Sequence, residues 1–379
     1  MKKLFFIAAI ASVALASCVK NEVAPTAMQQ DEITFAAPVV GTPTKVDLIT
    51  TFPTTNTFGV FGYYYAANFN GFAAGELYMN NVQVSHVANA GGDTDGGWVA
   101  DGYYWPKQTD ATLTFAAYYP YMATGASHDA TGIHFTDYEV KTTASEDLLF
   151  SDRSYNNKKA SQSADNTTYY GVNITFQHAL SAILFKAKAA TGLTGNADKP
   201  NYTFVIKKIE VVDAQNKGSF NQGITDATDG TTPATPAAST ADWTISGTST
   251  ATTYSAYDNA TGITVASSTE AVSANGSGAG VDNGKADLIL LPQNLAGVKV
   301  RVTYDMRHDK MAVGEYVTGN VAEANLSYDD DVDDTKDVTS WLRGKRYIYT
   351  LVLDLDKIYF APNMTDWVDV TVAGEPLVI

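Results

Sequence analysis

The sequence predicts an all-β protein built from antiparallel sandwiches. Of the 379 residues 45% are hydrophobic, and these include 22 tyrosines, alongside abundant Thr, Val and Gly. Tyr, Thr and Val are typical of strands, whereas the excess of Leu, Glu, Lys and Ala that helices favour is small. Short apolar segments with two-residue alternation recur between clusters of Gly, Asn, Asp and Pro. No ten-residue stretch shows a helical stripe, so a βαβ winding is not expected.

Alternation predicts the strands in order along the chain. Tyr347, Tyr349, Leu351, Leu353 and Leu355 share one face of a strand, and Val298, Val300, Val302 and Tyr304 share one face of another. Between the latter, Lys299, Arg301 and Thr303 are expected to face water. Further strands are predicted at 33–35, 58–64, 113–119, 133–140, 174–188, 204–212 and 287–291.

The N-terminal segment is typical of a lipoprotein signal peptide. Lys2 and Lys3 precede a short apolar run, and the small residues Ala16 and Ser17 come directly before Cys18, the single cysteine. We expect cleavage before Cys18 and covalent attachment of lipid to its thiol, which would anchor an exported precursor. The apolar run is shorter than the roughly 20 residues that span a bilayer. The alternative is a buried free cysteine in a leader helix, which would have no redox partner.

Composition changes divide the chain into segments. The prediction is a signal peptide at 1–17, a lipidated leader with the first strand at 18–45, an N-terminal β-sandwich at 46–155, a polar linker at 156–170 and a C-terminal β-sandwich at 171–379. The C-terminal part carries a Thr-, Ser- and Gly-rich insertion at about 223–284. We expect this long insertion to be a hairpin with mobile ends, and a mucin-like stalk is the alternative. The residues within it that offer burial are Trp243, Ile245, Tyr254, Tyr257 and 263–265.

Charge and motif content exclude several classes of function. The net charge of −16 argues against nucleic acid as a partner, because nucleic acid selects for clustered Lys and Arg. The sequence has no zinc-protease helix motif, nucleophile elbow or phosphate-binding glycine loop, and its five histidines lack metal-ligand spacing. No catalytic residue, resident metal or cofactor other than the lipid is predicted.

Two polar features have both a structural and a functional interpretation. His178 lies between Phe176 and Leu180 in an apolar strand, and we expect a core histidine that is hydrogen-bonded to the backbone rather than a catalytic one. The acidic run from Asp329 to Asp334 has the oxygen ligands that calcium prefers, but it lacks the turn glycine and distal glutamate of a helix-loop-helix site. A solvated loop is the expected structure there.

Several short motifs follow one another in a characteristic order. They are Ile33-Thr34-Phe35, Thr44-Lys45, the segment 58–63, Tyr103-Tyr104-Trp105-Pro106, the segments 113–120, 147–150, 176–181, 206–209 and 341–347, and Trp367. In order and spacing this pattern resembles the fimbrillin-like proteins of the Bacteroidales, which are subunits of the type V pilus. The resemblance extends over almost the whole chain, although each motif alone is weak.

The resemblance implies a fold and a life cycle. The fold would be two transthyretin-like antiparallel β-sandwich domains in tandem. The precursor would be an outer-membrane lipoprotein exposed at the surface, from which a trypsin-like protease removes the leader and the first strand. Another pilin subunit would then insert a donor strand by β-augmentation, giving a head-to-tail polymer and a mature form in extracellular fimbriae.

Lys45 is the predicted cleavage site. Before Lys107 the basic residues are Lys2, Lys3, Lys20 and Lys45, and only Lys45 follows a turn-rich stretch. Cleavage there would release the strand that contains Ile33 and Phe35. Better-known members of the family have arginine at this step, which leaves the identity of the protease open. The alternative is that Lys45 is a surface residue of an uncleaved anchor or solitary lipoprotein.

The C-terminal tail is the predicted donor strand. Val368, Val370 and Val372 alternate with polar residues, and the chain ends in Leu377, Val378 and Ile379. A terminus rich in β-branched residues is an aggregation hazard unless it is paired with a strand. The alternative is that Val368 to Val372 forms the last strand of the second domain, which would suit a tip subunit.

Two other functions remain as alternatives. A solitary surface lipoprotein could bind glycan or host ligand through Tyr63-Tyr64-Tyr65 or Tyr103-Tyr104-Trp105, although such aromatic residues more often fill a sandwich core. A hydrolase that uses His178 is the other. The sequence does not distinguish a stalk subunit from a tip or anchor subunit.

Overall fold

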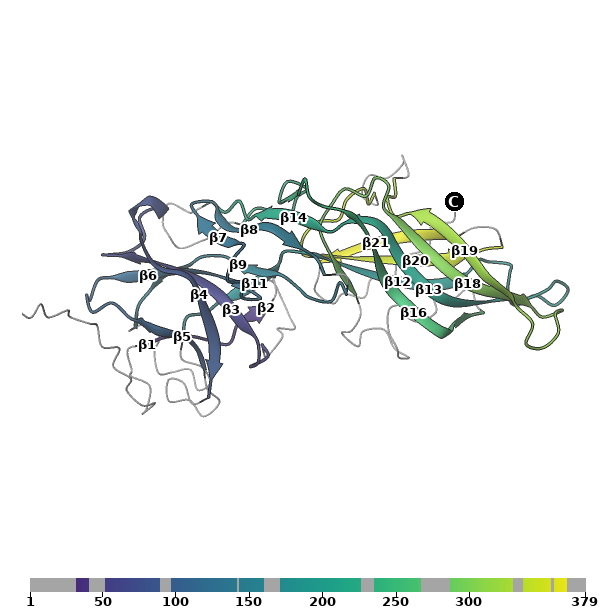
Figure 1. Ribbon diagram of the computed structural model, residues 1–379, viewed down its shortest axis with the longest axis horizontal. Coiled ribbons are helices and arrows are strands. Elements are labelled where there is room, and N and C mark those ends of the chain that lie inside the picture. Colours follow the sequence, from purple (N-terminus) through teal and green to yellow (C-terminus); the bar gives the residue numbers. More distant parts are fainter. Residues whose placement is uncertain are drawn as a thin grey trace, which may run out of the picture.

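The computed structural model describes residues 32–40, 52–88, 97–141, 143–159, 171–225, 235–266, 287–329, 337–355 and the backbone of 358–366. In this part the protein is all-β, as predicted, and its helical structure is one three-residue turn, η1 (Phe72–Ala74). No helix among these residues has the length and apolar character needed to cross a membrane. The molecule is elongated, with β1 to β6 at one end and β12, β13 and β16 to β21 at the other (Figure 1).

The N-terminal sheet has the order β1-β5-β4-β3-β6-β9-β11-β2, and β10 also pairs with β6. Its strands are β1 (Glu32–Phe35), β2 (Val39–Val40), β3 (Thr57–Tyr65), β4 (Glu76–Val87), β5 (Gly97–Tyr104), β6 (Thr112–Tyr119), β9 (Leu149–Ser151), β10 (Ser154–Asn157) and β11 (Thr175–His178). Neighbouring strands are antiparallel except β11 and β2, which run parallel.

A four-stranded sheet joins the two halves of the molecule. Its order is β15-β14-β8-β7, made of β7 (Ala126–Asp129), β8 (Gly132–Glu139), β14 (Lys217–Asn221) and β15 (Trp243–Ile245). Phe220 of β14 stacks on Phe135 of β8 with ring centroids 5.5 Å apart, and it also lies 4.9 Å from Phe150. The Trp243 indole N–H donates to the carbonyl of Ala179 at 2.7 Å. These contacts fix the C-terminal half against the N-terminal sheet.

The C-terminal half is a sandwich of two four-stranded sheets. One has the order β17-β12-β20-β21 and the other β16-β13-β18-β19. The strands are β12 (Ser181–Ala189), β13 (Tyr202–Gln215), β16 (Ala251–Val265), β17 (Leu288–Leu290), β18 (Lys299–His308), β19 (Val317–Asn325), β20 (Lys345–Leu353) and β21 (Ile358–Asp366). The predicted alternation is confirmed for the apolar positions from Val298 to Tyr304 and from Tyr347 to Leu353, which are buried. It is wrong for Leu355, which follows the end of β20 and is 39% exposed.

The predicted strand at 174–188 is wrong as a single element. The structure divides it at Ala179 and Leu180, so that β11 belongs to the N-terminal sheet and β12 to the C-terminal sandwich. Here the Ala179 amide donates to the carbonyl of Leu148, and the Leu180 carbonyl accepts from Gly344. The apolar residues Ala179 and Leu180 continue directly into the apolar strand β12, so alternation cannot show that the chain changes sheet there. The N-terminal sheet therefore continues beyond the predicted linker at 156–170.

The predicted insertion at about 223–284 contributes a long strand to the core. Strand β16 pairs with β13 from Phe204↔Val265 to Gln215↔Ala251 and is an edge of its sheet, which differs from the expected hairpin. Tyr254 and Val265 are buried, whereas most of the Thr, Ser and Ala between them faces outward. An edge strand needs few apolar residues, which is why its composition resembles that of a loop. Residues 226–234 and 267–286 lie outside the described part.

Candidate functional site

One extended segment closes the N-terminal sheet on itself. This closing segment, residues 32–40, contains β1 and β2. Its first half pairs antiparallel with β5, and its second half pairs parallel with β11. The Val172 amide donates to the Thr34 carbonyl at 2.9 Å, and the Ala36 amide returns a bond to the Val172 carbonyl at 3.0 Å. Both edges of the closing segment are therefore occupied, and its removal would leave β5 and β11 as open edges.

The side chains of the closing segment alternate between the core and the outside. Ile33 and Phe35 have no exposed surface, whereas Thr34 between them is partly exposed. The Phe35 ring meets Phe58 and Phe115 edge-on, with centroids 5.8 and 5.4 Å away. Such edge-to-face pairs add to the free energy of burial. Ile33 and Phe35 thus fill two adjoining apolar sites in the sheet.

Aromatic residues form the floor around these sites. The Phe52 ring lies 5.2 Å from Trp98, 5.1 Å from Tyr119 and 6.0 Å from Phe176. Phe52, Trp98 and Phe176 belong to a core cluster, with Tyr119 packed against it, that is distinct from the larger one that runs from the other face of the sheet into the C-terminal half. Because Phe52 follows Lys45 in sequence, this floor stays in the chain whatever happens to the closing segment.

Gly171 permits the closing segment to lie against β11. A Cβ atom at this position would lie 2.4 Å from the carbonyl carbon of Phe35 and 2.5 Å from the amide nitrogen of Ala36. Both are backbone atoms, so a change of rotamer cannot relieve the collision. Glycine is the residue that allows this approach.

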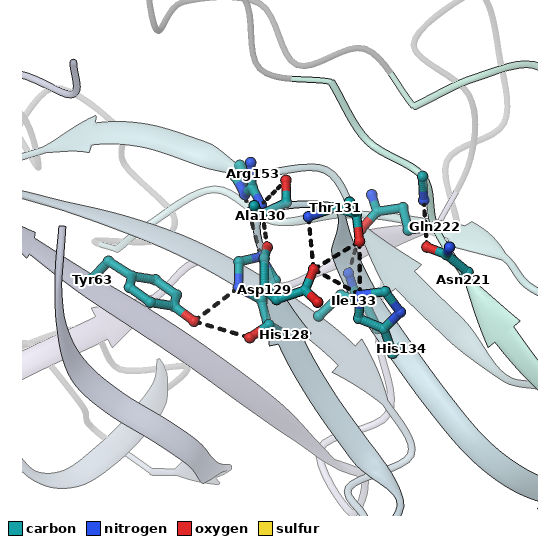
Figure 2. Close-up of polar contacts among 11 residues, drawn as sticks. Tyr63, His128, Asp129, Ala130, Thr131, Ile133, His134, Arg153, Asn221 and Gln222 are labelled. Atoms are coloured by element: carbon teal, nitrogen blue, oxygen red, sulfur yellow. Dashed lines mark hydrogen bonds and ion pairs between the residues drawn. The ribbon is translucent and has the colours of Figure 1, made fainter. Parts of the chain in front are cut away.

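A polar cluster lies on the opposite side of the same sheet, where Arg153 is buried against the β7–β8 hairpin (Figure 2). The Arg153 Nε donates to His128 Nε2 at 3.2 Å, and its guanidinium also donates to the carbonyls of Asp129 and Ala130. The other ring nitrogen of His128 lies 3.1 Å from the Tyr63 hydroxyl of β3. These bonds hold the hairpin to β3 and to the turn between β9 and β10.

The electrostatics of this cluster keep His128 neutral. Burial, reinforced by the adjacent Arg153 cation, lowers the pKa of His128 to about 3. Burial likewise raises the pKa of Tyr63 to about 12. Although burial opposes it, hydrogen bonds from His134 and Thr131 lower the pKa of Asp129 to about 2. The neutral imidazole of His128 accepts from Arg153 and lies beside the protonated hydroxyl of Tyr63, so it joins three elements of the fold.

The structure describes one of the two polar features singled out in the sequence. His178 Nδ1 lies 2.6 Å from an Asp147 carboxylate oxygen, a side-chain partner that the expected backbone hydrogen bonding did not include. Asp147 follows a loop and comes close only through the pairing of β9 with β11, so the sequence could not place it. Among the described residues no three His, Cys, Asp or Glu side chains gather in a way that could hold a metal ion. Asp330 to Asp334 lie outside those residues.

The aromatic residues considered for glycan stacking are mostly in the core. Tyr63, Tyr65 and Trp105 are buried, and Tyr104 is 44% exposed. Tyr63 and Tyr65 occupy alternate positions of β3 and belong to one core cluster, whereas Trp105 follows β5 and belongs to the other. They cannot serve as a stacking platform.

The remaining predicted site residues divide into two groups. Ile33 and Phe35 lie in β1, in the strand expected there. Cys18, Lys45 and the tail residues Val368, Val370, Val372, Leu377, Val378 and Ile379 lie outside the described residues, so their roles stay predictions.

Sequence reasoning missed the residues that receive the closing segment. Gly171 and Val172 were placed beside a linker, and Phe52 was not singled out. A signal was present, because Val172, Ile174 and Phe176 alternate directly after Gly171. That pattern predicts a strand preceded by a close approach, but not which segment approaches it.

The geometry can be compared with known proteins. The model of a family described as fimbrillin-like matches residues 44–367. The chain belongs to the fimbrillin-like family. Membership supports a pilus-type adhesion subunit at the cell surface that associates with other pilin subunits, with a structural rather than an enzymatic role. No curated protein matches this fimbrillin-like chain significantly.

One solved structure shares the fold of the fimbrillin-like chain at low sequence identity, and others are similar to it. A fimbrial protein from Bacteroides vulgatus is 15% identical, with a TM-score of 0.52 over 88% of this chain and 99% of that one. Putative cell adhesion proteins from Bacteroides uniformis and Bacteroides ovatus are 16% and 14% identical, with TM-scores of 0.49 and 0.44. They cover 88% and 90% of this chain, and 97% and 99% of their own chains.

Proposed function

We propose that the fimbrillin-like chain is a structural pilin subunit that polymerises by donor-strand exchange and supports adhesion. The precursor is held at the outer membrane by lipid on Cys18. A trypsin-like protease cuts after Lys45, the leader leaves with the closing segment, and the tail of another copy takes its place. The mature subunit then belongs to an extracellular fimbria.

The observation that carries this proposal is the position of the closing segment. It is paired with strands on both sides, yet it lies entirely before Lys45 in sequence. One cut can therefore separate a fully integrated strand from the rest of the sheet. Strands inside the chain cannot be withdrawn in this way.

The energetics favour refilling of the opened groove. Burial of Ile33 and Phe35 contributes about 1.5–3 kcal/mol for each side chain, and their loss exposes the rings of Phe58 and Phe115 to water. The open edges of β5 and β11 also lose their backbone partners. An extended apolar segment from another molecule restores both kinds of interaction.

The polymer that results is an open filament. Each subunit offers one groove, and Val368 to Ile379 provide one donor, so the contact is head-to-tail and does not close on itself. In the precursor the groove is already filled by its own closing segment. Cleavage therefore controls when polymerisation starts.

N-terminal sequencing of sheared surface material tests this proposal, with the variant Lys45→Gln and the control Lys20→Gln. We expect fibre subunits to start at Val46. We also expect Lys45→Gln to abolish the gel ladders of subunit oligomers that resist sodium dodecyl sulfate. Lys20→Gln leaves the ladders intact, because a cut at Lys20 does not release the closing segment. Fibre subunits that start at an acylated Cys18 would contradict the proposal and favour an uncleaved lipoprotein that binds glycan or host ligand, or an anchor.

A further inference from the structure

The end of the chain repeats the sequence pattern of the closing segment. Glu32-Ile33-Thr34-Phe35-Ala36 corresponds to Asp369-Val370-Thr371-Val372-Ala373, and Pro38-Val39-Val40 corresponds to Pro376-Leu377-Val378 after one additional residue. Both segments read as an acidic residue, a β-branched residue, Thr, an apolar residue, Ala and then Pro followed by two aliphatic residues. The tail lies outside the described residues, so this correspondence is one of sequence.

The structure explains why the groove requires this pattern. Ile33 and Phe35 are buried, Thr34 is partly exposed, and the next buried positions are Pro38 and Val40. The strand partner changes after Phe35, where pairing with β5 ends and pairing with residues 172–176 continues, because the amides of Ala36 and Val39 donate to the carbonyls of Val172 and Ile174. Pro38 lies between these two donors, so its missing amide proton removes neither bond. Each shared residue type thus matches a position with a defined environment.

We propose that the tail of another copy enters the groove in the same direction as the closing segment and in the register that this correspondence defines. This inference rests on the proposed function. Val370 occupies the site of Ile33, and Val372 occupies the site of Phe35 between Phe58 and Phe115. Thr371 lies opposite Val99, where Thr34 lies in the precursor. Pro376 to Val378 follow β11.

The other registers that keep Val370 on the buried face fit less well. A shift of two residues in one direction puts Val368 and Val370 into the two apolar sites, but it sets the carboxylate of Asp369 against the buried Val99. A shift in the other direction puts Gly374 at the site of Phe35 and leaves that site empty. A shift of one residue would turn every valine outward.

The extra residue in the tail falls where the groove tolerates it. It lies between Ala373 and Pro376, which corresponds to the partly exposed Ala36 and Ala37 at the change of strand partner. A small bulge containing Gly374 can form there without disturbing the two apolar sites. Val372 is smaller than Phe35, so the donor fills this site less completely than the closing segment does.

Cysteine cross-linking tests the register in cells that assemble the fibre. Cleavage after Lys45 removes Cys18, so engineered cysteines are then the only thiols of the mature chain. We expect Val99→Cys with Thr371→Cys to give an intermolecular disulfide, identified by mass spectrometry of the linked peptides. Two matched controls combine Val99→Cys with either Asp369→Cys or Ala373→Cys. They should lose this cross-link, because a displacement of two residues along the strand adds about 6.6 Å to the distance between the cysteines and exceeds the reach of a disulfide.

The outcomes separate the register from strand exchange itself. Fibres in which residue 369 or 373 is linked instead of 371 overturn the register and leave strand exchange standing. Fibres processed at Lys45 without any link to the tail overturn the inference by showing that another segment is the donor. Fibres whose subunits retain Cys18 and the closing segment overturn the proposed function as well.

A second pair of variants covers the case in which the cysteines disturb assembly. Val372→Phe restores the ring that fills the Phe35 site and raises the temperature at which fibres dissociate in detergent. Val370→Phe overfills the Ile33 site and lowers that temperature. The opposite order would contradict the register.

Discussion

The two halves of the molecule both contain a parallel strand pair in an otherwise antiparallel arrangement, but they build it differently. In the C-terminal half β12 and β20 pair over eight positions, from Ala182↔Arg346 to Ala189↔Leu353. In the N-terminal half the parallel contact is short, with two pairs between β2 and β11 and one bridge from Phe35 to Val172. The closing segment also lies near the N-terminus of the chain, whereas β12 and β20 are both internal.

This difference shows which half is suited to opening. Withdrawal of β12 or β20 would require the loss of a long ladder and of the Phe185–Tyr349 stack in the middle of the core. Withdrawal of the closing segment breaks shorter ladders and needs one cut in the chain. The proposed strand exchange therefore concerns the N-terminal half, and the C-terminal half keeps its own strands.

The largest expected effect comes from matched phenylalanine truncations in the two halves. Phe35→Ala and Phe185→Ala each remove a fully buried ring, and each should lower the free energy of unfolding of the precursor by about 3–5 kcal/mol. Only Phe185→Ala should also weaken the fibre, because Phe35 leaves with the leader. Urea unfolding of the precursor and heating of fibres in detergent measure the two effects. Equal weakening of the fibre by both variants would mean that the closing segment stays in place.

A smaller effect is expected from Gly171→Ala compared with Gly247→Ala. The added methyl group at 171 collides with the backbone of Phe35 and Ala36, whereas nothing lies within 4 Å of a Cβ at Gly247. We expect Gly171→Ala to lower the free energy of unfolding of the precursor by about 1–3 kcal/mol and to speed proteolysis near Lys45. It should also slow polymerisation, because a donor needs the same space. If Gly171→Ala behaves like Gly247→Ala, the closing segment does not lie against β11.

The smallest effect is a pH dependence of stability that arises from a residue of the N-terminal half. The pKa of His128 is lowered to about 3 in the fold, against about 6.5 when unfolded, so the unfolded chain binds more protons between these values. Stability from this group is complete above about pH 6.5 and declines as the pH falls toward 3, by at most about 1.4 kcal/mol per pH unit. His128→Gln should remove the contribution of this residue to the pH dependence of the free energy of unfolding, measured by urea unfolding between about pH 7 and about pH 5. An unchanged slope would show that His128 is not buried beside Arg153.

How much could be predicted from the sequence differed between the strands. Strands such as β18 and β20 were predictable because one face is buried and the other is not, which leaves a two-residue period. Strands β4 and β19 are mostly exposed, and their place is set by pairing with β3 and β18. Their apolar residues do not mark one continuous buried face, so the strands were not predicted.

The candidate site shows the same limit. The apolar character of Ile33 and Phe35 was visible in the sequence, and so was the lysine that follows them. That the segment is paired on both edges depends on Val99 and Val172, which lie about 65 and 140 residues away along the chain. Such pairing is decided by the whole sheet and not by local propensity.

Hydrogen exchange at the Val172 amide tests the central claim most directly. In the precursor this amide donates to the Thr34 carbonyl at 2.9 Å, so its partner lies in the segment that cleavage removes. We predict slow exchange in the precursor, fast exchange in the subunit after cleavage and separation of the leader, and slow exchange again in the fibre. A Val172 amide that stays protected in the separated subunit, or that exchanges quickly in the fibre, would contradict the account.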